Sequence, residues 1–188
     1  MSVVSRIKYM ENDVICLAEC IKPDYKTIYK SWKDRNTILG YNIELHFSFD
    51  EYCDKLKNDS NWNNWQAVIM RLEDNAVMGR IGLSGELPDL SITIFPAYVN
   101  QGYGSMAFSL GVKYCFEVLK LESVYAGCYE DNISSRKMIE KCGFKRNPDG
   151  DVIESHVFTG ENRLQLDFVI IGLRVVGEHS SPLRVWKL

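Results

Sequence analysis

The chain has no apolar stretch long enough to cross a membrane, and this absence excludes a large class of proteins. Within its 188 residues no run approaches the roughly 20 apolar residues that a membrane-spanning helix needs. The first residues, Met1 to Arg6, also lack the apolar core of a secretory signal peptide. We therefore expect a soluble, cytoplasmic protein without a membrane partner.

An excess of positive charge is missing too. The 22 Lys and Arg residues are outnumbered by 25 Asp and Glu residues, and the formal net charge is −3. The basic residues are scattered along the chain, whereas a protein that binds nucleic acid usually carries a basic patch or stripe. The composition therefore argues against a nucleic-acid partner.

Motifs that bind metals or carry redox chemistry are absent. The six cysteines include no C-x-x-C pair, and they fall inside periodic segments rather than in loops. The three histidines, His46, His156 and His179, are too far apart in the sequence to indicate a metal site. We expect reduced, mostly buried thiols and no metal.

The length allows one sizeable hydrophobic core, since 46% of the residues are hydrophobic and a second independent domain would need a longer chain. We expect a single domain over residues 1–171. The tail, residues 172–188, contains Gly177, Pro182 and only a brief apolar patch. It is expected to be an edge strand or an arm that contacts a partner, and a homodimer is one possibility.

Apolar periodicity and turn residues divide the domain into helices and strands. Helices are expected at 25–33, at 51–58 with Asp50 as its cap, after residue 105, and from Asp131-Asn132 to Lys141. The expected strands are 16–20, 66–72, 76–83, 89–95, 123–129, 152–159 and 164–171. Three antiparallel strands in series thus lead into a glycine-containing loop.

That loop, Asn100-Gln101-Gly102-Tyr103-Gly104-Ser105, lies where a strand gives way to a helix. Main-chain N–H groups at a helix start are unpaired and the helix dipole is positive there, so the segment suits a phosphate. A tight turn that needs glycine for its geometry explains the same residues. A dinucleotide fingerprint would need a third glycine where Ala107 stands, and a Walker loop is excluded because the chain has no Gly-Lys-Ser or Gly-Lys-Thr.

A second signal follows at residues 130–144, where Asn132 and Ser135 precede Glu140-Lys141-Cys142-Gly143-Phe144. Taken alone it indicates a well-capped helix. Together with Ile94-Phe95-Pro96 and the glycine loop, it resembles the GNAT superfamily of acetyl-CoA-dependent N-acetyltransferases. The closing hairpin, with Glu154, Val157, Gly160 and Asp167, resembles the branch of ribosomal-protein N-terminal acetyltransferases. The resemblance covers most of the chain.

The resemblance implies an α+β fold of three α/β/α layers, with a central mixed, mostly antiparallel sheet of about seven strands and helices on both faces. It implies acetyl-CoA as cosubstrate, with main-chain groups at Ile94 and Phe95 on the pantetheine arm and a side chain from Asn132 beside it. The pyrophosphate would bind the loop residues Gln101, Gly102, Tyr103, Gly104 and Ser105. Val99 departs from the family pattern, in which that position is Arg or Gln.

The chemistry implied is direct attack of a primary amine on the thioester in a ternary complex. An alkyl amine with a pKa near about 10.4 must lose a proton first, and three carboxylates are candidates for the base: Glu86, Asp149 and Glu154. Many family members protonate the leaving thiolate with a Tyr, but Ile139 stands at that position. Ser135 is therefore the candidate for the leaving sulfur, against an ordinary role in the first helical turn.

Two other functions remain open at this stage. The losses at Val99 and Ile139 leave room for a catalytically silent CoA-binding or regulatory module. A nucleotide-dependent oxidoreductase is disfavoured by the missing third glycine. The acceptor, a small-molecule or peptide amine, is not identified, because acceptor pockets are formed by variable loops.

Overall fold

The structure, a computed structural model, describes residues 5–58, 65–85 and 87–172. Glu86 and the tail beyond residue 172 lie outside the described residues. Five α-helices are described: α1 (Tyr25–Ser31), α2 (Arg35–Tyr41), α3 (Phe49–Asn58), α4 (Tyr103–Glu117) and α5 (Ile133–Lys141). The strands in the same ranges are β1 (Lys8–Glu11), β2 (Ile15–Ala18), β3 (Gln66–Arg71), β4 (Val77–Ser84), β5 (Asp89–Ile94), β6 (Ser123–Tyr129), β7 (Lys145–Arg146), β8 (Val152–Ser155) and β9 (Asn162–Ile171).

These nine described strands form one mixed sheet in the order β1-β2-β3-β4-β5-β6-β9-β7, and β8 pairs with the other end of β9. Every pairing is antiparallel except that of β5 with β6. The α+β class and the mostly antiparallel sheet are confirmed. The expected number of strands was too low because β1 is a short, partly exposed strand and β7 has only two residues.

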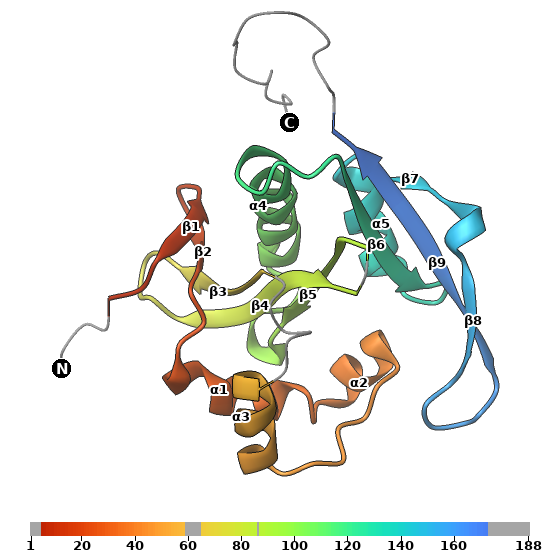
Figure 1. Cartoon of the computed structure of the whole chain (residues 1–188), viewed down its shortest axis with the longest axis horizontal. Helices are drawn as coiled ribbons and strands as arrows, with labels where there is room; N and C mark the ends of the chain where they lie inside the picture. The colour runs from red at the N-terminus through yellow and green to blue at the C-terminus, as the bar shows by residue number, and fades with distance from the viewer. Residues whose placement is uncertain (1–4, 59–64, 86, 173–188) are drawn as a thin grey trace, which may run out of the picture.

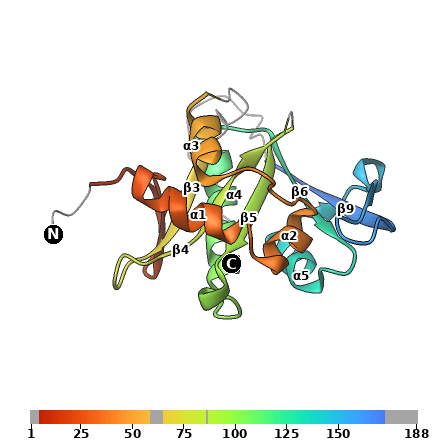
Figure 2. The same cartoon turned by 90° about the horizontal axis from the view of Figure 1, so that it is seen from below.

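Helices cover both faces of the sheet, as expected. In Figure 1, α4 lies above strands β3 to β5, and α1, α2 and α3 lie below them. Figure 2, seen from below, shows α1 and α3 in front of the strands and α4 behind. Alternate strand residues serve the two faces: Ile15 and Leu17 pack with α4, while Cys16 and Ala18 pack with α1 and α3.

The helix starts are fixed by side-chain caps. Ser48 and Glu51 form a reciprocal cap at α3, with Glu51 accepting from the Ser48 N–H at 2.7 Å, so the expected cap at Asp50 is wrong. Asp34 accepts from two main-chain N–H groups at the start of α2, the 3.0 Å bond from Asn36 among them. The composition of α2, with Asn, Thr and Gly among seven residues, is poor for a helix, which is why the sequence did not indicate it.

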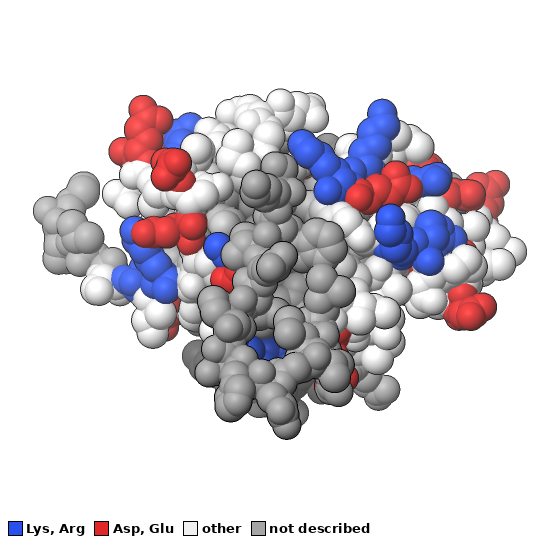
Figure 3. Space-filling model, turned by 90° about the horizontal axis from the view of Figure 1, so that it is seen from above, with Lys and Arg blue, Asp and Glu red and all other residues white. Residues whose placement is uncertain are grey.

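Charges of both signs are mixed among the described residues on one face of the molecule. On the face seen from above, Lys and Arg side chains alternate with Asp and Glu side chains and do not gather into a broad patch of one sign (Figure 3). Among the described residues, no helix is both long and apolar enough to cross a membrane.

The close approach of β4 and β5 gives a test of the fold beside the site. A Cβ added to Gly79 would lie 2.1 Å from the main-chain oxygen of Thr93, so Gly79→Ala forces the two strands apart. We expect the free energy of unfolding to fall by about 1–3 kcal/mol in urea denaturation. Gly40→Ala is the matched control: nothing lies within 4 Å of its Cβ, and alanine in a helix is better by up to about 1 kcal/mol. A destabilised Gly40→Ala beside an unaffected Gly79→Ala would contradict this packing.

Candidate active site

The sheet divides between β5 and β6. The two strands run parallel, but within the described residues they pair at one position only, Asp89 with Tyr125. The Tyr125 N–H donates to the Pro88 carbonyl at 2.9 Å, and beyond this point β5 remains paired with β4 and β6 with β9. The carboxyl ends of β5 and β6 are therefore the two arms of a V, with unpaired main-chain edges facing each other.

At the end of β5, Ile94 has main-chain groups that face this opening and Phe95 does not. The Phe95 N–H donates to the Met78 carbonyl and the Phe95 carbonyl accepts from the Tyr98 N–H, both at 2.8 Å. Both main-chain groups of Phe95 are thus used within the protein, and its side chain is buried. Successive residues of a strand point their main-chain N–H and C=O groups to opposite edges. Since those of Phe95 point away from the V, the N–H and C=O of Ile94 point into it.

The glycine loop leads from β5 into α4. Gly102, with φ of 84°, is the N-cap of α4, a conformation that favours glycine. Within the described chain, the N–H groups of Tyr103, Gly104 and Ser105 donate to no acceptor. Gln101 is exposed, and its side chain donates to the Ala97 carbonyl at 3.0 Å, so it fastens the loop.

Gly104 brings the two sequence motifs together. A Cβ at this position would lie 3.6 Å from Ile94 Cγ1 and 3.7 Å from Met138 Sδ, so the start of α4 sits between the end of β5 and α5. Three segments that are far apart in the sequence thus meet at the open edge of the sheet. The arrangement presents unpaired amides and the positive end of a 15-residue helix next to that edge.

Arg71, at the end of β3, was not predicted as part of this site. Its Nη1 donates to the Tyr103 hydroxyl at 3.3 Å, and its guanidinium carbon lies 5.8 Å from the centroid of the Tyr98 ring. Asp74 holds the guanidinium in a bidentate pair at 2.7 and 2.9 Å, and this pair lowers the pKa of Asp74 to about 2. A cation therefore stands beside the first turn of α4, where Val99 offers none.

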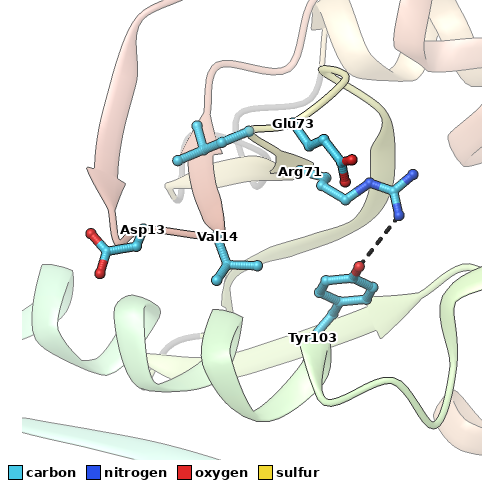
Figure 4. A pocket seen from close by; sticks show the side chains of 6 residues that line it. Asp13, Val14, Arg71, Glu73 and Tyr103 are labelled. Carbon is cyan, nitrogen blue, oxygen red and sulfur yellow. Dashed lines mark hydrogen bonds between the residues drawn. The ribbon is translucent and has the colours of Figure 1, made fainter.

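A hollow of about 430 Å³ lies next to Arg71 and Tyr103 (Figure 4). Asp13 and Glu73 bring two carboxylates to its lining, which makes the hollow itself unsuitable for phosphate. The anion-binding part is therefore the helix start with the Arg71 guanidinium, and not the interior of this hollow.

The other arm of the V continues into α5. Asn132 is its N-cap, and its Oδ1 accepts from the Ser135 N–H at 3.2 Å and from the Ser134 hydroxyl at 3.0 Å. The Asn132 amide nitrogen keeps its protons for another partner. The Ser135 hydroxyl makes no hydrogen bond to the described part of the chain, and the residue is half-buried.

Ile139 is buried in the core on the α4 face, with 2% of its surface exposed. An aliphatic side chain fits there, and proton transfer from this position is impossible. Ile139, which stands where many family members have a tyrosine, thus serves the hydrophobic core.

A polar cluster caps the end of β6. The buried Tyr129 hydroxyl donates to Glu154 Oε2 on β8, and the Asn42 side-chain amide donates to the same oxygen at 3.4 Å. Burial, with the hydrogen bond to Glu154, raises the pKa of Tyr129, so the phenol stays protonated at neutral pH. The Arg163 guanidinium carbon lies 3.7 Å from the centroid of the Tyr129 ring.

The carboxylates expected as bases thus differ in their surroundings. Glu154 accepts two hydrogen bonds, from Tyr129 at the end of β6 and from Asn42, whereas Asp149 is exposed on the short turn before β8. Glu86 lies outside the described residues. No local pattern indicates Tyr129, because its role depends on contacts with Glu154 and Arg163, which are more than 20 positions away.

The end of α2 connects the two arms. The Thr93 hydroxyl on β5 donates to the Tyr41 hydroxyl at 3.0 Å. The next residue, Asn42, donates to Glu154 and to the Ser155 carbonyl, the latter at 2.8 Å, and accepts from the Val157 N–H at 2.8 Å. One dipeptide therefore contacts both β5 and β8 on the face of the sheet opposite α4.

A family model described as an acetyltransferase (GNAT) domain matches residues 16–145, more than half of the chain. The chain belongs to the GNAT acetyltransferase family. It is therefore an acyltransferase of a family that uses acetyl-CoA. It is 29% identical over 129 residues to the uncharacterized N-acetyltransferase YnaD of Bacillus subtilis, an alignment that covers 65% of this chain and 74% of YnaD.

Solved structures share the fold of this acetyltransferase. A spermidine N-acetyltransferase from Vibrio cholerae, in complex with CoA and spermine, superposes with a TM-score of 0.74 at 20% identity, over 85% of this chain and 96% of that one. A GNAT acetyltransferase from Bacillus anthracis gives 0.71 at 17% identity, over 88% and 98%. A candidate ribosomal-protein-serine acetyltransferase from Vibrio cholerae gives 0.65 at 18% identity, over 88% and 97%.

No group of three or more His, Cys, Asp or Glu residues that could hold a metal ion is found in the described ranges. The family's cosubstrate supplies an activated acetyl group and needs no metal ligand from the protein. The residues fit it, since the unpaired amides at the start of α4 and the Arg71 guanidinium suit a diphosphate.

Asp89 lies at the vertex of the V, where it pairs with Tyr125 on one side and Ser84 on the other. Burial, with a smaller effect of the nearby Asp167 charge, raises the pKa of the Asp89 carboxyl to about 6. The folded state of this acetyltransferase therefore favours the neutral carboxyl at the position where the two arms join.

Asp89→Asn tests this link between pH and stability. Because the folded pKa of about 6 exceeds the unfolded value of about 3.9, the stabilisation is complete below about pH 4 and is lost as the pH rises through 6. The wild type should lose up to about 3 kcal/mol of unfolding free energy from this group between pH 4 and 7, and the variant should not. Urea denaturation across this range measures the difference, with the exposed Asp149→Asn as control. Parallel profiles for wild type and Asp89→Asn would contradict the raised pKa.

Proposed function

We propose that this acetyltransferase transfers the acetyl group of acetyl-CoA to a primary amine by direct attack in a ternary complex. The observation that carries the proposal is the V between β5 and β6, with unpaired amides of α4 beside the carboxyl end of its β5 arm and the Tyr129–Glu154 pair at the end of its β6 arm. One side of the opening suits an anionic cosubstrate and the other suits an amine. Direct transfer needs both in one place.

The cofactor side consists of main-chain groups and one cation. In this proposal the N–H groups of Tyr103, Gly104 and Ser105, with Arg71, bind the diphosphate. The main chain of Ile94 and the amide of Asn132 bind the pantetheine arm from the two sides of the V. Phe95 orients the end of β5 by packing in the core, since its main-chain groups are already bonded.

The amine side needs a base. Glu154 is our choice among the three carboxylates, because Tyr129 at the end of β6 and Asn42 orient it, and Asn42 follows Tyr41, which contacts β5. The amine nitrogen attacks the thioester carbonyl carbon and a C–N bond forms. The amine proton leaves toward Glu154, directly or through an ordered water, and the C–S bond breaks as the carbonyl re-forms. Ser135, whose hydroxyl is unbonded within the described chain, is the candidate for donating a proton to the thiolate.

The ribosomal-protein branch is one candidate for the acceptor class. Its support in the sequence is the pattern at Glu154, Val157, Gly160 and Asp167, and one structural neighbour carries that description. Two of these residues have roles in the fold: Gly160 turns the hairpin with φ of 72°, and Asp167 accepts from the Asn147 side chain at 2.6 Å. The pattern is therefore weak evidence for a protein acceptor.

Cofactor binding is tested by the melting temperature with acetyl-CoA, CoA or NAD added. We expect stabilisation by the first two only, by about 2.7 kcal/mol at a concentration 100 times the Kd. Arg71→Met removes the cation beside α4 and should weaken acetyl-CoA binding about tenfold, the value of one charge-assisted hydrogen bond. Lys113→Met, which removes an exposed cation elsewhere on α4, should leave the affinity unchanged. Stabilisation by NAD, or by neither CoA form, would refute the cofactor assignment.

The chemistry is tested by thiol release from acetyl-CoA with a panel of primary amines at several pH values. Glu154→Gln should lower kcat by about 10²–10⁴ near pH 7, and the deficit should shrink toward pH 10 as the amine loses its own proton. Ser135→Ala should show a smaller loss without this recovery. Asp149→Asn and Glu86→Gln compare the other two carboxylates. Binding of acetyl-CoA without turnover of any amine would favour the silent module, and a larger effect at Asp149 or Glu86 would move the base there.

A further inference from the structure

Arg80, on β4, makes no ion pair with any of the described residues. It pairs in register with Val68 on β3 and Thr93 on β5, on the face of the sheet that α1 and α3 cover. Its guanidinium carbon lies 4.1 Å from the centroid of the Trp32 ring and 5.3 Å from that of Tyr41. Its Nε and Nη2 atoms are buried and have no hydrogen-bond partner in the described part of the protein.

The other described arginines are treated differently. Five of them make an ion pair with a carboxylate, namely Arg6, Arg71, Arg136, Arg146 and Arg163. The sixth, Arg35, is exposed and lies over the Phe158 ring. Arg80 alone among those described lacks a carboxylate while two of its guanidinium nitrogens, Nε and Nη2, are buried. The Trp32 and Tyr41 rings contact the cation, but a buried N–H without an acceptor is costly.

The position of Arg80 relates it to the amine side of the site. Thr93, its neighbour on β5, is bonded to Tyr41, whose ring also contacts the Arg80 guanidinium. Asn42, the residue after Tyr41, is bonded to Glu154. Arg80 thus contacts Tyr41 and the candidate base Glu154 contacts Asn42. The Cα atoms of Tyr41 and Asn42 are about 3.8 Å apart, so this dipeptide connects the two groups.

We propose that the acceptor is an amine that also carries a carboxylate, and that Arg80 binds this carboxylate while Glu154 faces the amine. Arginine suits this role, since its planar fork matches a carboxylate and Trp32 and Tyr41 hold its plane. The inference rests on the proposed function and adds the acceptor's chemistry to it. It also distinguishes this chain from the spermidine N-acetyltransferase that shares its fold, because a polycation would meet an unpaired guanidinium.

The experiment compares matched acceptors in the presence of acetyl-CoA. Each ω-amino acid of two to six carbons, and each of several short peptides with an acidic second residue, is paired with its uncharged carboxamide. For at least one acceptor, we expect kcat/KM of the carboxylate form to be at least tenfold higher than that of its carboxamide. Reaction of the free amino acids only indicates a small-molecule acceptor, and reaction of the peptides only indicates a polypeptide.

The variants separate recognition from packing. Arg80→Met should raise KM for the carboxylate about 10–100-fold, with kcat little changed, and leave KM for the carboxamide as it was. Arg80→Lys should recover part of the loss. Arg35→Met, another arginine over an aromatic ring, should have no effect on either acceptor. The melting temperature of Arg80→Met should not fall, because the variant removes two buried nitrogens that have no partner among the described residues.

Two results would overturn the inference. One is equal kcat/KM for carboxylates and carboxamides, and the other is an equal change for both acceptors in Arg80→Met. Either result, with acetyl-CoA still stabilising the protein and amines still acetylated, would refute the acceptor assignment alone. Loss of acetyl-CoA stabilisation and of all turnover in the wild type would instead refute the proposed function.

Discussion

The pairing of β5 with β6 at a single residue is the constraint on which the rest of this structure depends. Six residues of β5 pair with β4 and seven residues of β6 pair with β9, so each arm is rigid by itself. Between the arms the main-chain groups lack a strand partner, an arrangement that costs free energy unless something else satisfies them. A ligand with an extended polar arm can pair with both edges. The glycine loop lies beside the end of the β5 arm and Asn132 follows the β6 arm, so the two motifs flank the opening although they are distant in the sequence.

The two parts of the divided sheet are connected on one face by α2 and the residue that follows it. Tyr41 contacts β5 through Thr93, and Asn42 contacts β8 through Glu154 and Ser155. Asn42 has φ of 55°, in the left-handed region that asparagine tolerates better than most residues. A helix of only seven residues thus sets the distance between the arms, and the same residues orient the groups that we assign to the acceptor. Stability of the opening and recognition of the acceptor are coupled at this point.

The conformation of the glycine loop and the cap of α5 were predictable from the sequence, whereas the polar contacts around the candidate base Glu154 were not. Gly102, Gly104 and Asn132 act through local geometry, a helix start or a cap, which short motifs reveal. Arg71, Tyr129, Asn42 and Arg80 act through contacts between residues 25 to more than 100 positions apart, or between neighbouring strands, and no local pattern indicates them. The same reason explains the elements. The continuous apolar run of β3 and the alternating pattern of β6 are local signals, and both strands were placed well. In contrast, α2 is stabilised by Asp34 and the burial of Ile38 against a composition that disfavours helix.

The loss of the usual tyrosine at Ile139 is tolerable when the two proton transfers are compared in magnitude. Removing a proton from an amine of pKa about 10.4 at pH 7 costs about 5 kcal/mol, since each pKa unit is worth about 1.4 kcal/mol. A thiolate whose conjugate acid has a pKa of about 8.5 gains only about 2 kcal/mol on protonation at the same pH. The step that most needs help from the protein is therefore amine deprotonation, the step that we assign to Glu154 with Tyr129 and Asn42. With Glu154 oriented by Tyr129 and Asn42, the position on α5 is free to serve the core, which is where Ile139 lies.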